Sequence, residues 1–465
     1  MEQVAEAAPP PPAGSHPPGA TSEVGLLADG GSAFWARMHS ARAATRTLDL
    51  QYYLWASDVT GRLLVRELLA AADRGVRVRL LIDDLYGLGH ERAISALNGH
   101  PMITVRWFNA SRWRKWGWVG FASELLFGNW HLNRRMHNKA WITDGEQVIC
   151  GGRNIGDRYF DAPADFNFRD LDIEVKGEAA QEAVAAFEAY WRSPLSRPVS
   201  RLPRMRTRKS LLKRFRRRLE DSAASAGTQE VLRDMRGLRR RMERGLDIAN
   251  DAIRIIADPP DKARGQAESA IGPVVAKLLA SAQREALLIS PYFVPGEAGT
   301  RSLIGLVERG VRVSVITNSL AATDVVAVHG GYARYRQRLL EAGVEIFELR
   351  SIGETKSGVF GSRGASLHTK AVLVDDGPSM IGSFNLDPRS IDLNTEMAVL
   401  IQHSALTRLV RRLHAKLAAP ERSWKLGLEG GRLTWNGTPG REPDATWRRR
   451  ALAWTVGCLP IESQL

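Results

Sequence analysis

The sequence has few cysteines and no long apolar runs, and each of these features argues against one class of protein. The 465 residues include two cysteines, Cys150 and Cys458, which lie far apart in apolar surroundings and form no CxxC spacing. Disulfide frameworks need more, so we expect two buried thiols in a reducing compartment. No run of about 18 apolar residues is present, so the sequence predicts no membrane-spanning helix.

The amino terminus lacks the marks of a secretory signal. It carries Glu2, Glu6 and a proline-rich stretch, with no basic segment and no apolar core. We expect a disordered tail over residues 1–22 and no signal peptide. The chain also has no cysteine–histidine or carboxylate cluster with the spacing of a zinc or two-metal site, so we expect no metal and no other cofactor.

Positive charge is in excess. The net charge is +14, which favours an anionic partner, either nucleic acid or an acidic membrane surface. Residues 201–218 hold ten lysines and arginines and no acidic residue. As a helix, this segment would carry its apolar residues on one side. It could lie on an anionic bilayer or pack that side against a domain, and the sequence favours neither.

Tryptophan is concentrated in residues 107–130, which contain five of them. Cationic residues are interleaved with these tryptophans: Arg112, Arg114 and Lys115. This composition is typical of the headgroup region of a bilayer. A loop packed over the active-site cleft is compatible with that interpretation, and stacking on nucleic-acid bases is its rival.

A strand–helix–strand pattern occurs twice. Apolar periodicity predicts in the first half a helix over 31–43, a strand over 47–55, a helix over 61–74 that Gly75 ends, and a strand over 76–82. The second half repeats the unit with a strand over 286–293, a helix over 300–308 and a strand over 309–316. Such units build parallel sheets, so we expect two copies of one α/β domain.

A short motif is also duplicated, at residues 136–144 and 367–375. Each copy has His, Lys two residues later, Asp seven residues after the His and Asn 17 residues after it, and each pair is 231 residues apart. The pairs are His137 and His368, Lys139 and Lys370, Asp144 and Asp375, Asn154 and Asn385. Taken as a strand, each copy presents His and Lys on one face. The two Asp residues fall in the turn beyond and are expected to be structural.

Two facing copies would form one phosphodiester-cleaving site. Cleavage needs a nucleophile, an acid for the leaving alcohol and donors for the non-bridging oxygens. Two His, two Lys and two Asn supply these groups without a metal. The paired motifs resemble the HKD motifs of the phospholipase D superfamily, and from about Leu26 onward the chain is similar to its bacterial cardiolipin synthase branch, closest to the C type. The phrases that carry this likeness lie at residues 51–55, 133–139, 151–157, 290–295, 317–324 and 384–390.

The resemblance implies a mechanism and two further residues. One His would form a phosphatidyl-histidine and the other would serve as acid and base; we take His137 as the nucleophile. The family places an acid behind each His. Glu396 matches that position in the second half, and Asp170 is the choice in the first, with Asp165 and Asp172 as rivals.

The resemblance also implies two phospholipase D-like α/β sandwich domains, with sheets flanked by helices and one active site at their interface. The ranges that we expect are a disordered tail over 1–22, domain 1 over 23–195, a basic helical linker over 196–262, domain 2 over 263–420 and a C-terminal extension over 421–465.

The predicted function is transfer of a phosphatidyl group onto phosphatidylglycerol. Phospholipase D hydrolysis is the first alternative, a nuclease of the same fold the second, and a silent lipid-binding scaffold the third. Expected partners are phospholipids, namely phosphatidylglycerol with phosphatidylethanolamine as a further candidate donor, and an anionic membrane surface, without nucleic acid. We expect a monomer with two pseudo-symmetric halves, held peripherally at the bacterial cytoplasmic membrane.

Overall fold

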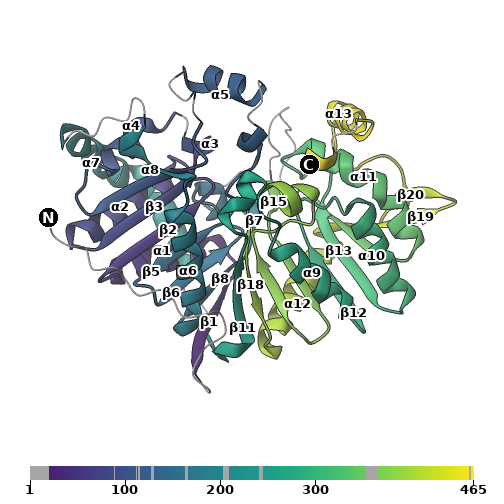
Figure 1. The fold of residues 1–465 in the computed structure, drawn as a ribbon. Helices are drawn as coiled ribbons and strands as arrows, with labels where there is room; N and C mark the ends of the chain where they lie inside the picture. Colours follow the sequence, from purple (N-terminus) through teal and green to yellow (C-terminus); the bar gives the residue numbers. More distant parts are fainter. Residues whose placement is uncertain are drawn as a thin grey trace.

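Two large sheets with helices around them make up the molecule (Figure 1). The computed structural model describes residues 20–87, 89–111, 113, 116–126, 130–162, 166–202, 209–239, 245–351, 364–459 and 462–464. Each half of the chain contributes one large sheet. The expected fold class, a duplicated α/β architecture with helices flanking the sheets, is confirmed.

The first sheet is mixed. Its strands are β1 Thr21–Leu27, β2 Thr47–Tyr52, β3 Arg77–Asp83, β4 Ile103–Phe108, β5 Ala140–Thr143, β6 Gln147–Gly151, β8 Asp172–Lys176, β9 Ser196–Pro198 and β10 Leu246–Ala249. Their order is β10-β1-β8-β6-β5-β2-β3-β4-β9. β2, β3 and β4 are parallel, as the strand–helix–strand pattern predicts, whereas β5 pairs antiparallel with β2. The start of β5 therefore lies beside the carboxyl end of β2.

The second sheet repeats this layout. Its strands are β11 Ile253–Ala257, β12 Glu285–Ile289, β13 Arg312–Asn318, β14 Glu345–Leu349, β16 Ala371–Val374, β17 Ser379–Gly382, β18 Met397–Ile401, β19 Ser423–Glu429, β20 Arg432–Trp435 and β21 Thr438–Pro439. Their order is β11-β18-β17-β16-β12-β13-β14-β19-β20-β21. β12 and β13 are parallel and β16 is antiparallel to β12, so the two motif copies occupy equivalent places.

The helices lie outside the sheets and between them. They are α1 Gly30–Ala43, α2 Val59–Asp73, α3 Asp84–Gly87, α4 Glu91–Leu97, α5 Gly117–Leu126, α6 Gln181–Arg192, α7 Lys209–Ala224, α8 Ala226–Arg239, α9 Ile271–Ala280, α10 Gly296–Glu308, α11 Val326–Glu341, α12 Ser404–Ala418 and α13 Trp447–Gly457. Gly75 and Gly310 follow α2 and α10 with φ of 95° and 84°. Residues with side chains rarely adopt this conformation, so both glycines end their helices.

The two halves share one apolar core. Buried side chains of β5, β6 and β8 form a single cluster with those of β16, β17 and β18, and α6 and α12 complete it. Two outer clusters lie under the remaining helices of each half. Because apolar burial stabilises in proportion to area, this shared core holds the halves in a defined relation.

Two short strands cross between the halves. β7 (Phe166–Arg169) comes from the first half and β15 (Gly364–Leu367) from the second, and they pair in parallel. Met136 and Thr395 form a second parallel bridge between the halves. Each crossing ends directly beside one His of the duplicated motif.

The basic segment packs on the first half. Leu219 and Ala223 of α7 and Leu232 and Met235 of α8 belong to the core that α1 and α2 form. Arg62 of α2 also donates to the Ser222 hydroxyl at 2.8 Å. Of the two alternatives, the apolar side of this helix therefore packs against a domain. Its cations at 204, 206 and 208 lie outside the described residues.

Strands lie inside the ranges expected for the tail, linker and extension. β1 begins at Thr21, β9, β10 and β11 fall within 196–262, and β19, β20 and β21 within 421–465. They pair onto sheet edges because unpaired backbone groups at an edge are costly. The expected domain boundaries remain predictions, and most of the predicted tail lies outside the described residues.

Two further expectations concern the cysteines and the membrane. Cys150 is buried, as expected, but Cys458, which follows directly after the end of α13, is exposed. None of the helices in the described part of the chain combines the length and apolarity needed to cross a bilayer.

Candidate active site

Each motif His is held by the opposite half of the molecule. The His137 amide donates to the Thr395 carbonyl at 2.8 Å, and the His368 amide donates to the Arg169 carbonyl at 2.8 Å. The strands β5 and β16 begin only after the motif lysines. The expectation that a strand presents His and Lys is therefore wrong in its detail. The crossing between the halves positions the histidines, because each His amide donates to a carbonyl of the opposite half.

Each motif His also contacts a carboxylate that comes from the opposite half of the chain. His137 Nδ1 lies 2.8 Å from a Glu396 carboxylate oxygen, and His368 Nδ1 lies 2.6 Å from Asp170 Oδ2. Both acids are buried. A carboxylate beside Nδ1 accepts a hydrogen bond from the proton on that nitrogen, which leaves the Nε2 lone pair available. Both rings therefore turn the same nitrogen toward a substrate.

Asp170 is the residue in contact, rather than its two rivals. Asp172 is ion-paired with Arg37 at 2.8 Å, and Asp165 lies outside the described residues. A Cβ at Gly152 would lie 2.1 Å from Asp170 Oδ1. The second glycine of the turn before Asn154 is therefore required for the Asp170 carboxylate to enter.

Burial keeps both imidazoles neutral. Desolvation lowers the pKa of His137 to about 4, although the Glu396 charge opposes this shift. Desolvation and the charges of Lys370 and Lys139 lower the pKa of His368 well below its ordinary value. At neutral pH either ring could act as a nucleophile or base, since only the unprotonated Nε2 has a lone pair to offer.

The two lysines are arranged alike. Each Nζ donates to the carbonyl of its own motif His. Burial lowers the pKa of Lys139 to about 7 and that of Lys370 to about 8. These buried cations lie within electrostatic reach of the carboxylates Asp170 and Glu396, and they suit the non-bridging oxygens of a phosphodiester anion.

The two asparagines are buried but differ in their partners. Asn154 donates to the Tyr159 hydroxyl at 3.0 Å and accepts from the Leu54 amide at 3.2 Å. The Asn385 side-chain oxygen has no hydrogen-bond partner among the described residues. Both lie in the turn after the second strand of their motif. The backbone N–H of Asn385 donates to the Ser390 hydroxyl at 3.2 Å.

These contacts bring both copies of the duplicated motif together at the interface of the two halves, and comparison with known proteins identifies the family. The family model for "Cardiolipin synthase, PLD-like domain" matches residues 37–191 and 275–418. The chain belongs to this phospholipase D-like family. It is a phosphatidyltransferase of the phospholipase D type, and the predicted resemblance and enzyme class are confirmed.

Curated relatives cover nearly the whole chain. Cardiolipin synthase C of Escherichia coli is 36% identical over 459 residues, which span 92% of this chain and 93% of the relative. Cardiolipin synthase 2 of Staphylococcus epidermidis is 25% identical over 84% of this chain and 67% of its own. The crystal structure of phosphatidylserine synthase from Haemophilus influenzae has a TM-score of 0.65 at 14% identity over 95% of both chains, which establishes the common fold.

The two motif aspartates of this phospholipase D-like chain lie away from the histidines. Asp144 accepts from the backbone amides of residues 45–47, and Asp375 accepts from those of residues 283–285. Both have positive φ, 54° and 51°. Each carboxylate ties the turn after its motif strand to the start of the neighbouring strand, which is the place that a structural role requires.

Several residues of the site were not predicted. Asp83 ends β3 and accepts from the Met136 amide at 3.0 Å, while Asn318 ends β13 and accepts from the Leu367 amide at 2.8 Å. Both hold the residue just before a motif His. A signal was available, because Asp83 and Asn318 occupy corresponding places after the duplicated strands, 235 residues apart.

Aromatic rings pack against both histidines. The Tyr53 ring lies 5.2 Å from the His137 ring, measured between centroids, in an edge-on arrangement. Tyr159 lies 5.3 Å and Phe168 lies 5.0 Å from the His368 ring. These contacts restrict the rotation of both imidazoles. Tyr53 belongs to one of the phrases that carry the family likeness, whereas nothing in the sequence marks Phe168.

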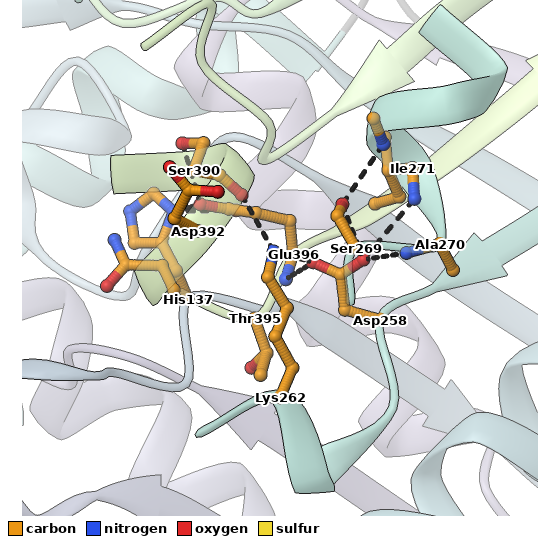
Figure 2. A network of polar contacts seen from close by, with 12 residues as sticks. His137, Asp258, Lys262, Ser269, Ala270, Ile271, Ser390, Asp392, Thr395 and Glu396 are labelled. Atoms are coloured by element: carbon orange, nitrogen blue, oxygen red, sulfur yellow. Dashed lines mark hydrogen bonds and ion pairs between the residues drawn. The ribbon is translucent and has the colours of Figure 1, made fainter. Parts of the chain in front are cut away.

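A buried polar network lies behind His137 (Figure 2). Ser390 donates to Glu396 at 3.1 Å, and the Lys262 ammonium donates to the Ser390 carbonyl at 2.8 Å and to Asp258 at 2.6 Å. Asp258 in turn accepts from the Glu396 amide at 3.1 Å. The network closes a ring through Glu396, so its carboxylate is held from both its backbone and its side chain.

One cluster of metal-binding residue types occurs among the described residues, at His329, Glu348 and Glu442. Arg336 already pairs with Glu348 at 2.9 Å and with Glu442 at 2.7 Å. The single guanidinium bridges both carboxylates, offsets one of their two charges and occupies oxygens that a metal would need, so the cluster forms an ion-paired network.

Proposed function

We propose that this enzyme moves a phosphatidyl group from a phospholipid donor onto the glycerol headgroup of phosphatidylglycerol, which yields cardiolipin. The observation that carries the proposal is the reciprocal pair of His–carboxylate contacts, each presenting Nε2, with Lys139 and Lys370 beside them. Relatives named for cardiolipin synthesis support this choice of substrate.

In the first step, the Nε2 lone pair of His137 attacks phosphorus. A P–N bond forms as the bond from phosphorus to the leaving alcohol oxygen breaks, and that oxygen takes a proton from His368. Binding of the phosphodiester anion adds negative charge near His368 and raises its pKa, so that the ring can hold the proton it delivers. The Lys139 and Lys370 ammonium groups and the Asn154 and Asn385 side chains would hold the non-bridging oxygens.

In the second step, neutral His368 takes the proton of the incoming glycerol hydroxyl. The hydroxyl oxygen attacks phosphorus, the P–N bond breaks, and the electron pair returns to His137. The carboxylates keep the Nδ1 proton in place in both steps, so neither ring changes tautomer. Burial favours transfer over hydrolysis, because both rings lie out of bulk water.

Product analysis tests this proposal. The purified chain is incubated with phosphatidylglycerol vesicles, with and without phosphatidylethanolamine, and the products are resolved. Cardiolipin is the expected product, and phosphatidic acid alone would overturn transfer. An acid quench followed by peptide mass analysis should find the phosphoryl adduct on His137. An adduct on His368 would reverse the two roles.

A further inference from the structure

Large exposed apolar side chains gather at one end of the molecule. Nine are exposed in the described part of the chain: Trp113, Trp116, Val119, Val325, Ile391, Trp447, Leu452, Trp454 and Leu459. The first three follow β4 and Val325 follows β13, at the carboxyl ends of parallel strands. Ile391 lies six residues after Asn385. This is also the end at which the motif histidines lie, beside β2 and β12.

The last helix, α13, provides the two most exposed tryptophans of this set. Trp447 and Trp454 are 71% and 73% exposed. With Ala451 and Cys458 they form a stripe at spacings of four, three and four residues, and all four are exposed. This spacing places them on one face of the helix. The outer face of α13 is thus a row of apolar and aromatic groups.

The opposite face of α13 is firmly attached to the body. The Arg449 guanidinium donates to the Leu320 carbonyl at 2.9 Å, and Ala453 is buried. α13 crosses α11 at Gly330, where a Cβ would lie 2.5 Å from the Ala453 carbonyl oxygen. Because this contact is so close, the helix is fixed and its tryptophans are held outward.

The segment around α5 is a second protrusion beside α13, and it also exposes apolar and aromatic side chains. Figure 1 shows α5 and α13 at the same end of the molecule, on either side of the region where β7 meets β15. In the α5 region Trp116 is 54% and Val119 is 74% exposed. Of the other residues in the predicted aromatic stretch, Trp107 is buried in β4. Arg112, Arg114 and Lys115 lie outside the described residues.

We propose that α5 and α13 dock this enzyme on an anionic lipid bilayer, with the active site facing the membrane between them. Two separate apolar protrusions at one end suit a broad surface better than a compact partner. Tryptophan prefers the bilayer interface, and Arg448, placed 5.6 Å over the Trp447 ring, adds a cation at that level. The net charge of +14 attracts the same surface.

This inference rests on the proposed function and specifies how the lipid reaches the site. It also replaces the basic segment as the docking element, because α7 turns its apolar side inward. A phospholipid whose headgroup lies between α5 and α13 would face the end of the molecule at which the histidines lie.

The test uses the full chain with Trp447→Ala and Trp454→Ala combined, and vesicles of phosphatidylglycerol and phosphatidylethanolamine. We expect vesicle binding in sedimentation to weaken by at least about tenfold, and turnover on vesicles to fall with it. Turnover of a short-chain, monomeric phosphatidylglycerol should stay within about twofold. Wild-type binding by this variant would overturn the proposal. So would a failure of the unchanged protein to bind vesicles.

Two controls separate the explanations. Lys213→Glu with Arg217→Glu reverses two exposed charges on α7 and should reduce vesicle binding less than the tryptophan variant. An equal or larger loss would mean that net charge alone causes binding, against the proposal. His137→Ala should bind vesicles as the wild type does. Docking without turnover in the unchanged protein would keep this inference and reject the proposed function.

Discussion

The two halves of the site carry the same reactive groups but support them differently. Glu396, behind His137, accepts from the hydroxyls of Ser383 and Ser390 and is tied to a buried ion pair. Asp170, behind His368, accepts from the Leu171 amide at 2.8 Å. Burial raises the pKa of Asp170, whereas for Glu396 the charges and hydrogen bonds of its neighbours outweigh burial and lower the pKa.

The two copies therefore share their reactive side chains, whereas the residues that surround the two carboxylates differ. A more firmly ionised carboxylate stabilises positive charge on its histidine, which is what a nucleophile acquires when it bonds to phosphorus. This asymmetry supports His137 as the nucleophile. The outer faces diverge in the same way, since α7 and α8 cover the first half and α13 stands on the second.

The largest expected effect comes from removing either histidine. His137→Ala and His368→Ala should each lower turnover by about 10⁴-fold or more, and the double variant should be little worse, because the two rings act as a unit. His39→Ala, at an exposed histidine, is the matched control and should keep full turnover. Substantial activity in one of the histidine variants would mean that the halves work independently.

Exchanging the carboxylates for amides measures the asymmetry directly. Glu396→Gln and Asp170→Asn should each reduce kcat by about 10²–10⁴-fold, since an amide no longer fixes the tautomer or stabilises the charged ring. We expect adduct formation on His137 to suffer more from Glu396→Gln. Rapid-quench measurement of the adduct gives the comparison, and equal effects on its formation would remove the basis for assigning the nucleophile.

Breaking the network behind His137 should mainly cost stability. Lys262→Met leaves the buried Asp258 carboxylate without its cation, and we expect a loss of about 3–5 kcal/mol in the free energy of unfolding. Urea unfolding measures it. Lys277→Met, at an exposed position of α9, should change stability by less than about 0.5 kcal/mol. A loss of less than about 1 kcal/mol in the free energy of unfolding for Lys262→Met would contradict this role of the network.

The activity of the enzyme should fall on the alkaline side of neutral pH. Since the pKa values of Lys139 and Lys370 are lowered to about 7 and about 8, kcat/KM for a monomeric substrate should fall as pH rises through that range, by up to about tenfold per pH unit between the two values and up to about a hundredfold per unit above both. Lys139→Arg should move the fall to higher pH, because a guanidinium stays protonated. An unchanged profile in that variant would show that Lys139 does not control the alkaline side.

The histidines have a matching effect on stability. Their folded pKa values lie below the ordinary 6.5, so the unfolded chain binds more protons between about pH 4 and about 6.5. Their contribution is therefore complete above about pH 6.5 and is lost as pH falls toward 4. Thermal unfolding at several pH values should show a smaller decline in His137→Ala than in the wild type.

The smallest effect is expected at the motif aspartates. Asp144→Asn and Asp375→Asn each weaken hydrogen bonds to three backbone amides at the surface, and should cost about 1 kcal/mol of stability with turnover unchanged. Calorimetry and the vesicle assay check the two parts. A large loss of turnover in either variant would give that carboxylate a chemical role that its position does not suggest.

Much of the fold and the reactive set could be predicted from the sequence. The duplicated spacing singled out His137, Lys139 and Asn154 with their counterparts, because two copies of one motif with the same internal spacing fold alike and occupy equivalent places in the two sheets. The repeated strand–helix–strand pattern predicted parallel pairing in each half. Residue types and local periodicity carry that information directly.

Only the tertiary structure decided which acid serves which histidine. Asp170 and Glu396 each cross to the opposite half, and nothing in the spacing of either copy records an exchange between copies. The packed side of α7 and the outward tryptophans of α13 were undecided for the same reason. An amphipathic pattern shows that a helix has an apolar face, whereas what covers that face depends on surfaces brought together from distant parts of the chain.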